Sequence, residues 1–314
     1  MDLLKEFRFT SVSGHFSPKP ASNLLGPLGM LKGAWKGQGF NQIWRPFNGG
    51  PPGQDRFLEL NQTHESLVFE EIPGDIPNRG LLQTDINLHG LRYLQQVQDA
   101  NVLGPNGALA GIHVEPGLWL HVPATTNPQD PTTVARLANI PHGTSLIAQG
   151  QALPPISGPP PIGAVSITPF TIAPPHNPVP FPETNLAILS PFRTDPEDIP
   201  NVTQAMVDNP NSVLMLGLQG KTVISTVTLK ISTIAPNPPS SGGGTSNIAF
   251  LQGAAGGPNA QAAQMDAIFW IETLQEADGR IKHQLQYTQT VLLNFNGLSW
   301  PHVSVATLIK QEPG

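Results

Sequence analysis

The side chains best suited to chemistry in this sequence are imidazoles and carboxylates, because the chain has nine histidines and no cysteine. It therefore has no thiolate nucleophile, disulfide, iron–sulfur cluster or Cys-ligated zinc site. The spacing His113-Val114-Glu115 places an imidazole and a carboxylate on one face of a strand, since alternate strand residues point the same way. A zinc deaminase would also need a downstream Cys-x-x-Cys motif, so that chemistry is excluded.

The elements that must position these side chains are predicted to be β-strands. Apolar residues alternate with polar ones instead of repeating at helical spacing. Residues 62–65 are predicted to form a hairpin loop, and Asp278-Gly279 a tight turn. Roughly ten or more strands favour an all-β barrel or sandwich. The clearest predicted strands cover residues 57–61, 66–70, 91–97, 117–122, 134–140, 221–231, 267–273, 282–294 and 303–310.

The composition excludes several other classes of protein. Charged residues make up 12% of the chain, about half of the usual share of roughly 25%, and there are 35 prolines, so a helical bundle is excluded. A hydrophobic content of 39% excludes a wholly disordered chain. The net charge of -6 offers no field that would attract nucleic acid. No apolar run approaches the ~20 residues of a membrane span, and no signal-peptide pattern is present, so a cytoplasmic protein without a membrane partner is predicted.

The densest motif is Gly33-Ala34-Trp35-Lys36-Gly37-Gln38-Gly39. Taken alone, it indicates a tryptophan that closes the bottom of a barrel and glycines that let the first strand bend. The motif also resembles the first strand of the nitrobindin family, which are small haem-binding β-barrels of lipocalin-like appearance. Three further stretches resemble the family in its order, residues 111–119, 134–143 and 287–310, so that the resemblance covers roughly residues 25–150 and 280–310.

The resemblance implies an antiparallel lipocalin-like barrel that binds haem b. His302 is then the proximal iron ligand, and Pro301 fixes the backbone direction just before it. With one histidine on the iron, the sixth position would stay open to nitric oxide, peroxynitrite or peroxide. The activity implied is that of a haem-dependent peroxynitrite isomerase or a peroxidase.

Other site residues follow from the same resemblance. His113 and Arg45 are predicted to be the distal catalytic groups, because peroxide chemistry needs an acid/base group and a cation. Trp35, Gln42 and Trp300 are predicted to contact the haem, with Gln42 at the position where the family has a threonine. For the tryptophans, simple core packing is the alternative, because large aromatic side chains dominate barrel cores.

The chain departs from a nitrobindin of ordinary size in one region. Residues 151–280 have no counterpart there and are predicted to be an insertion of strands and Pro/Gly-rich loops within a single domain spanning 1–314. These loops would cap the barrel, cover an edge strand or form a homodimer contact. The alternative function is a metal-free carrier of a fatty acid, isoprenoid or other apolar molecule in the barrel cavity.

Overall fold

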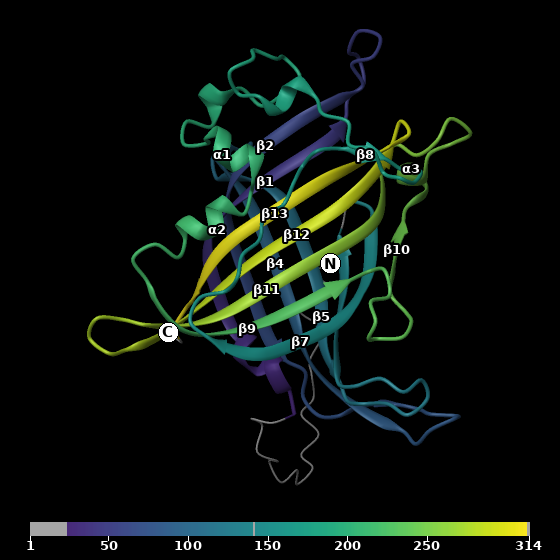
Figure 1. Cartoon of the computed structure of the whole chain (residues 1–314), viewed down its shortest axis with the longest axis vertical. Coiled ribbons are helices and arrows are strands. Elements are labelled where there is room, and N and C mark those ends of the chain that lie inside the picture. The colour runs from purple at the N-terminus through teal and green to yellow at the C-terminus, as the bar shows by residue number, and fades with distance from the viewer. Residues whose placement is uncertain (1–23, 141, 313–314) are drawn as a thin grey trace.

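The fold is a closed, ten-stranded antiparallel β-barrel (Figure 1). The computed structural model describes residues 24–140 and 142–312. Neighbouring strands around the barrel follow the order β1-β2-β4-β5-β6-β7-β9-β11-β12-β13, and β13 pairs with β1 to close it. The predicted all-β class and antiparallel barrel are confirmed.

The barrel strands are β1 (Gly33–Pro46), β2 (Arg56–Glu71), β4 (Ile86–Leu103), β5 (Leu109–Val122), β6 (Thr133–Ile140), β7 (Thr144–Ser157), β9 (Thr222–Ser232), β11 (Gln261–Gln275), β12 (Ile281–Phe295) and β13 (Leu298–Lys310). Short strands β3 (Ile76–Asn78), β8 (Phe170–Thr171) and β10 (Gly244–Asn247) pair with β4, β13 and β7. The helices are η2 (Gly26–Leu31), η3 (Pro182–Thr184), η4 (Pro196–Asp198), α1 (Gln204–Asp208), α2 (Ser212–Leu216) and α3 (Ala249–Gln252). Within the described residues, none of the helices has the length and apolar character needed to cross a membrane.

The prediction of a hairpin loop at residues 62–65 is wrong. Strand β2 runs through this stretch without a break, and Thr63 and Glu65 are buried there. Their side chains share a face with Leu67, which belongs to the barrel core. Because inward positions of β2 hold polar residues here, the composition of residues 62–65 resembles that of a loop. The turn predicted at Asp278-Gly279 is confirmed, since it joins β11 to β12 and Gly279 has φ +83°.

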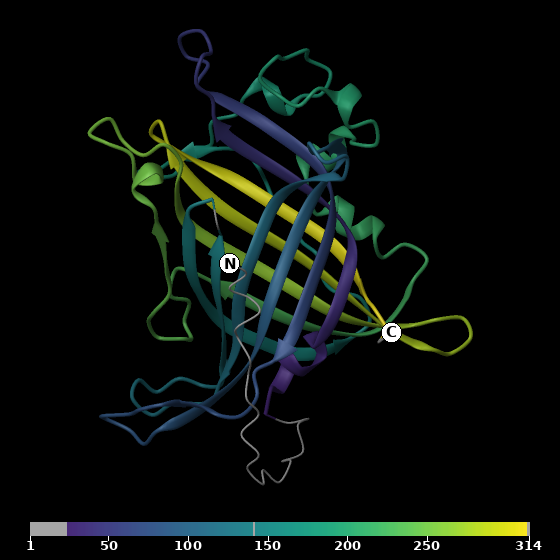
Figure 2. The ribbon, with the colours of Figure 1, turned by 180° about the vertical axis from the view of Figure 1, so that it is seen from behind.

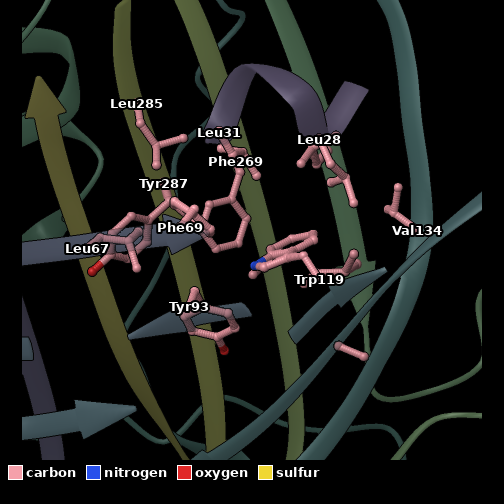
Figure 3. Packing of buried hydrophobic residues seen from close by; sticks show 14 of the residues in the cluster. Leu28, Leu31, Leu67, Phe69, Tyr93, Trp119, Val134, Phe269, Leu285 and Tyr287 are labelled. Atoms are coloured by element: carbon pink, nitrogen blue, oxygen red, sulfur yellow. The ribbon is translucent and has the colours of Figure 1, made fainter. Parts of the chain in front are cut away.

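One end of the barrel is closed by η2, as Figure 3 shows. Leu28 and Leu31 of this helix are completely buried against the interior. They join a cluster with Trp35 of β1, Trp119 of β5 and Phe269 of β11. The Trp119 and Phe269 rings meet edge to face, with centroids 5.2 Å apart. This end is a solid hydrophobic core that leaves any interior space to the opposite end.

A long segment covers part of the barrel from outside. We call residues 158–221 the outer segment; it contains η3, η4, α1 and α2, which lie near β1 and β13 in Figure 1. Apolar residues of the segment, among them Ile199, Val207 and Leu214, pack against outward-facing Phe40 and Val305. Seen from behind in Figure 2, β4 and β5 carry none of these helices on their outer face. Helices of the outer segment thus cover the barrel on one side only.

Hydrogen bonds fasten the outer segment to the barrel. Three outward-facing side chains donate to its backbone carbonyls: Trp44 Nε1 to Ile167 (2.9 Å), Gln42 Nε2 to Met206 (2.7 Å) and Gln286 Nε2 to Leu214 (2.8 Å). The predicted insertion, residues 151–280, contains this segment but also β9 and β11, which pair with each other and complete the barrel. That residues 151–280 are an insertion relative to a smaller barrel stays a prediction.

Candidate ligand cavity

A cavity of about 260 Å³ lies inside the barrel at the end away from η2. Every barrel strand except β9 contributes to its wall, together with β10 and α3. The wall is mostly apolar, and its hydrophobic members include Ile43, Val97, Ile112, Leu146, Met265 and Val291. A mostly apolar cavity with a few polar groups is the usual character of a small-molecule site.

His302 enters this cavity from β13. It pairs in register with Ile43 of β1, and Ser304 pairs with Asn41, so all four side chains share the inward face. His302 Nε2 lies 2.8 Å from Asn41 Oδ1, and Ser304 Oγ donates to the same oxygen at 2.6 Å. Burial, with a smaller effect of the charges that His113 and His142 carry when protonated, lowers the pKa of His302 to about 3. The imidazole is therefore neutral near pH 7.

Two further histidines face His302 across the barrel. His113 is on β5 and His142 follows β6, and these strands are four and five steps from β13 around the ten-stranded order. Both line the cavity, and their ring centroids are 5.3 Å apart. His113 Nε2 also lies 3.3 Å from Glu115 Oε2. The cavity therefore has imidazoles on two opposite walls.

A buried ionic network lies between the cavity and the hydrophobic end. Arg136 Nη2 donates to Glu115, and Arg136 Nε donates to the Tyr93 hydroxyl at 2.9 Å, which in turn donates to Glu115. Arg136 Nη1 donates to Gln289 Oε1 at 2.7 Å. Burial raises the pKa of Glu115, but the Arg136 charge together with the contacts of His113 and Tyr93 outweighs this effect and holds the pKa at about 2. All four polar groups of this network satisfy one another without a ligand.

A second network contains the other tyrosine of the chain. Tyr287 donates to Glu65 Oε2 at 2.6 Å, Gln95 Nε2 donates to the Tyr287 hydroxyl at 3.0 Å, and Thr63 donates to Glu65 Oε1 at 2.9 Å. Burial raises the pKa of Glu65, although these hydrogen bonds lower it in part. Glu65, Gln95 and Tyr287 all line the cavity, so this network forms part of its polar floor.

The structure places three of the predicted site residues at or beside this cavity. His113 and His302 line it from opposite walls. Arg45 donates through Nε to Glu59 Oε2 at 2.7 Å, and Glu59 is part of the lining, whereas the Arg45 side chain is partly exposed. Of the predicted catalytic pair, His113 thus lies in the cavity wall and Arg45 just beside it.

The other three lie elsewhere. Trp35 is in the hydrophobic end, where its Nε1 donates to Leu31 O at 2.7 Å. Gln42 faces outward beneath the outer segment. Trp300 stacks on Phe295 outside the cavity wall, with ring centroids 4.7 Å apart. For Trp35 and Trp300 the structure shows core packing.

Several cavity residues were not singled out from the sequence, chiefly Asn41, Glu65, Gln95, Tyr287 and Gln289. A usable signal exists only on β1, where Asn41 follows Trp35 at a spacing of six residues and so shares its inward face. On the other strands an inward polar residue looks the same in sequence as an outward one.

No group of three or more histidine, aspartate or glutamate side chains suited to a metal ion occurs in residues 24–140 and 142–312. Comparison with models of known protein families finds no match for this chain, and comparison with curated proteins finds none either. The ten-stranded barrel is compatible with lipocalin-like and nitrobindin-like folds. The functional argument therefore depends on the cavity itself.

Proposed function

We propose that this protein binds a small, mainly apolar molecule inside its barrel, with a polar group of the ligand against His302. The observation that carries the proposal is a mostly apolar cavity into which a neutral imidazole projects. Burial of apolar ligand surface supplies roughly 25 cal/mol per Å², and the few polar groups fix the orientation of the ligand.

The size of the cavity limits the size of the ligand. A dry apolar cavity of about 150 Å³ binds benzene, which has six heavy atoms. By the same scale, the volume of about 260 Å³ corresponds to a ligand of about ten heavy atoms. This supports the carrier alternative for short-chain or terpenoid-sized molecules.

The test compares ligand binding by the native protein with binding by a variant in which a larger side chain fills part of the cavity. An organic extract of the purified protein, analysed by mass spectrometry, should contain a molecule of this size. Ala262→Leu adds three carbon atoms to a wall residue of the cavity, and we expect it to abolish binding of that molecule. Ala100→Leu, in an outer groove, should leave binding unchanged. An empty extract, together with no binding of any apolar compound of this size, would refute the proposal.

Haem b, implied by the resemblance to nitrobindins, is a second candidate. The specific observation in its favour is His302: its imidazole is neutral, and one ring nitrogen is oriented by the Asn41 oxygen, as haem-ligating histidines require. A bound haem would supply an iron with an open position for nitric oxide, peroxynitrite or peroxide. The imidazole thus fits the iron.

The rest of the cavity does not fit haem. A tetrapyrrole is several times larger than the ligand that about 260 Å³ can enclose. Among the described lining residues there is also no lysine or arginine to pair with propionates. We therefore derive no reaction step through haem.

The absorption spectrum of haem-supplemented protein tests whether haem binds. If haem binds through His302, haem-supplemented protein shows a Soret band that disappears in His302→Ala and persists in His64→Ala, whose side chain lies in an outer groove. A spectrum equal to that of free haem would dismiss it and leave the carrier function standing.

A further inference from the structure

The charges around the cavity distinguish among apolar ligands that carry different polar groups. Its ionisable lining residues are Glu59, Glu65, Tyr287 and the three histidines, with no lysine or arginine among the described ones. The interior guanidinium of Arg136 is already bonded to Glu115, Tyr93 and Gln289. An anionic ligand would therefore lose its hydration without gaining a cation, which is strongly unfavourable.

The hydrogen bonds of Asn41 define which atoms of His302 are free. Ser304 Oγ donates to Asn41 Oδ1 at 2.6 Å, a distance that suits an O–H···O bond. This amide oxygen can only accept. His302 Nε2, at 2.8 Å from the same oxygen, must then carry the proton. A neutral imidazole protonated at Nε2 has a free acceptor at Nδ1.

Asn41 has a free donor of its own. Asn41 Nδ2 has no hydrogen-bond acceptor among the described residues, and neither it nor His302 Nδ1 is one of the fully enclosed unpartnered atoms. Both residues line the cavity. The wall at β1 and β13 thus offers a ligand an acceptor at His302 and a separate donor at Asn41.

We infer that the ligand is an uncharged alcohol of about ten heavy atoms, whose hydroxyl donates to His302 Nδ1. This rests on the proposed carrier function and narrows it, because a fatty acid is excluded by its charge. A hydroxyl can donate to Nδ1 without carrying a charge, whereas a carbonyl only accepts and an ammonium would bring a buried charge to a neutral imidazole.

The test compares ligands of one chain length. Nonan-1-ol, nonanoate and nonane are titrated into the intact protein at pH 7.5 and followed by calorimetry. We expect nonan-1-ol to bind about tenfold or more tightly than nonanoate, since an unpaired buried charge costs more than 1.4 kcal/mol. Equal or tighter binding of nonanoate would overturn the inference. Absence of binding by all three would instead refute the carrier function.

Variants test the assigned atoms. His302→Phe removes the acceptor and keeps a ring, so the preference for nonan-1-ol over nonane should fall about fivefold, in line with one hydrogen bond. His64→Phe, the same change in an outer groove, should leave that preference unchanged. If His302→Phe keeps the full preference, His302 is not the partner of the hydroxyl. If this variant does not fold, the ligand series on the native protein still decides.

Discussion

Glu115 and Arg136 form an ion pair inside the barrel, where neither side chain reaches solvent: their exposed fractions are 0% and 2%. The contact runs diagonally between β5 and β6: Arg136 pairs in register with Trp119, four residues from Glu115, and its long side chain spans the offset. The Tyr93 hydroxyl lies between the two charges and bonds to both. A buried pair of this kind stabilises the fold only while both partners remain.

Removal of one partner should therefore be severe. Arg136→Met leaves the Glu115 carboxylate buried without its cation, and we expect a loss of about 3–5 kcal/mol in the free energy of unfolding. Urea denaturation at pH 7 measures it. The double variant with Glu115→Gln should lose less than the sum of the two single losses. A loss below about 1 kcal/mol for Arg136→Met would contradict the buried pair.

Glu272 should make the protein less stable in alkali. This carboxyl is fully buried on β11, and Gln284 Nε2 donates to its Oε2 at 2.5 Å. Burial raises its pKa to about 7, from 4.5 in an unfolded chain. The contribution of Glu272 to the free energy of unfolding is thus complete below pH 4.5. It is lost as the pH rises through 7, because Glu272 releases its proton at a lower pH in the unfolded state than in the folded state. Glu272→Gln should remove this loss, worth about 3 kcal/mol at pH 8.

The measurement for Glu272 is the free energy of unfolding at pH 5 and at pH 8. Glu272→Gln should gain stability relative to the native protein only at the higher pH. Glu70→Gln, which changes an exposed carboxylate on β2, serves as the matched control and should show the same pH dependence as the native protein. Parallel curves for all three proteins would show that Glu272 does not titrate in this range.

Gly26 should tolerate no side chain. It has φ +51° at the start of η2, and a Cβ atom there would lie 2.7 Å from His121 Nε2. His121 is held by a contact of 2.8 Å between its Nδ1 and Leu24 O. Gly26→Ala should therefore lower the free energy of unfolding by more than the ~1 kcal/mol of backbone strain alone. Gly53 has φ +84° and open space around it, so Gly53→Ala measures the backbone strain alone. Equal losses of unfolding free energy in the two variants would rule out a clash with His121.

The attachment of the outer segment can be loosened at one bond. Trp44→Phe keeps the aromatic packing but leaves the Ile167 carbonyl without the donor seen at 2.9 Å, at a cost of about 1–2 kcal/mol. Hydrogen exchange should speed up in residues 158–221 and stay unchanged in β9. Trp119→Phe, in the hydrophobic end, should weaken the barrel instead. Faster exchange throughout the chain in Trp44→Phe would mean that segment and barrel unfold together.

The sequence predicts the barrel well because one physical rule, alternation across a pleated strand, governs most of it. Strands such as β9 and β12 satisfy that rule with β-branched and apolar residues. The same rule misleads at Thr63 and Glu65, where polar side chains point inward and complete a hydrogen-bond network whose partners, Gln95 and Tyr287, are distant in sequence. Such networks depend on which strands are neighbours, and this information is absent from any single segment.

The outer segment shows a second limit of sequence reasoning. Proline-rich composition indicates irregular backbone, but not the surface against which that backbone packs. Gln42 and Trp44 looked like strand residues of an ordinary barrel, yet their side chains bond to carbonyls more than a hundred residues away in the chain. The position of His302 on an inward face could be expected from its strand, whereas its contact with Asn41 required the closure of β13 on β1.

The unequal covering of the barrel has a mechanical consequence. A sheet packed on both faces loses contacts on one face or the other whenever it flexes, so the side formed by β1, β12 and β13 should be stiff. The outer face of β4 and β5 meets water except at Leu88 and Leu120, which pack with Ile72 and Ile76, and this side can yield at lower cost. His302 and Asn41 belong to the stiff side, while His113 and His142 stand at the compliant one. A molecule that enters the barrel would then displace the side chains of His113 and His142 and leave those of His302 and Asn41 in place.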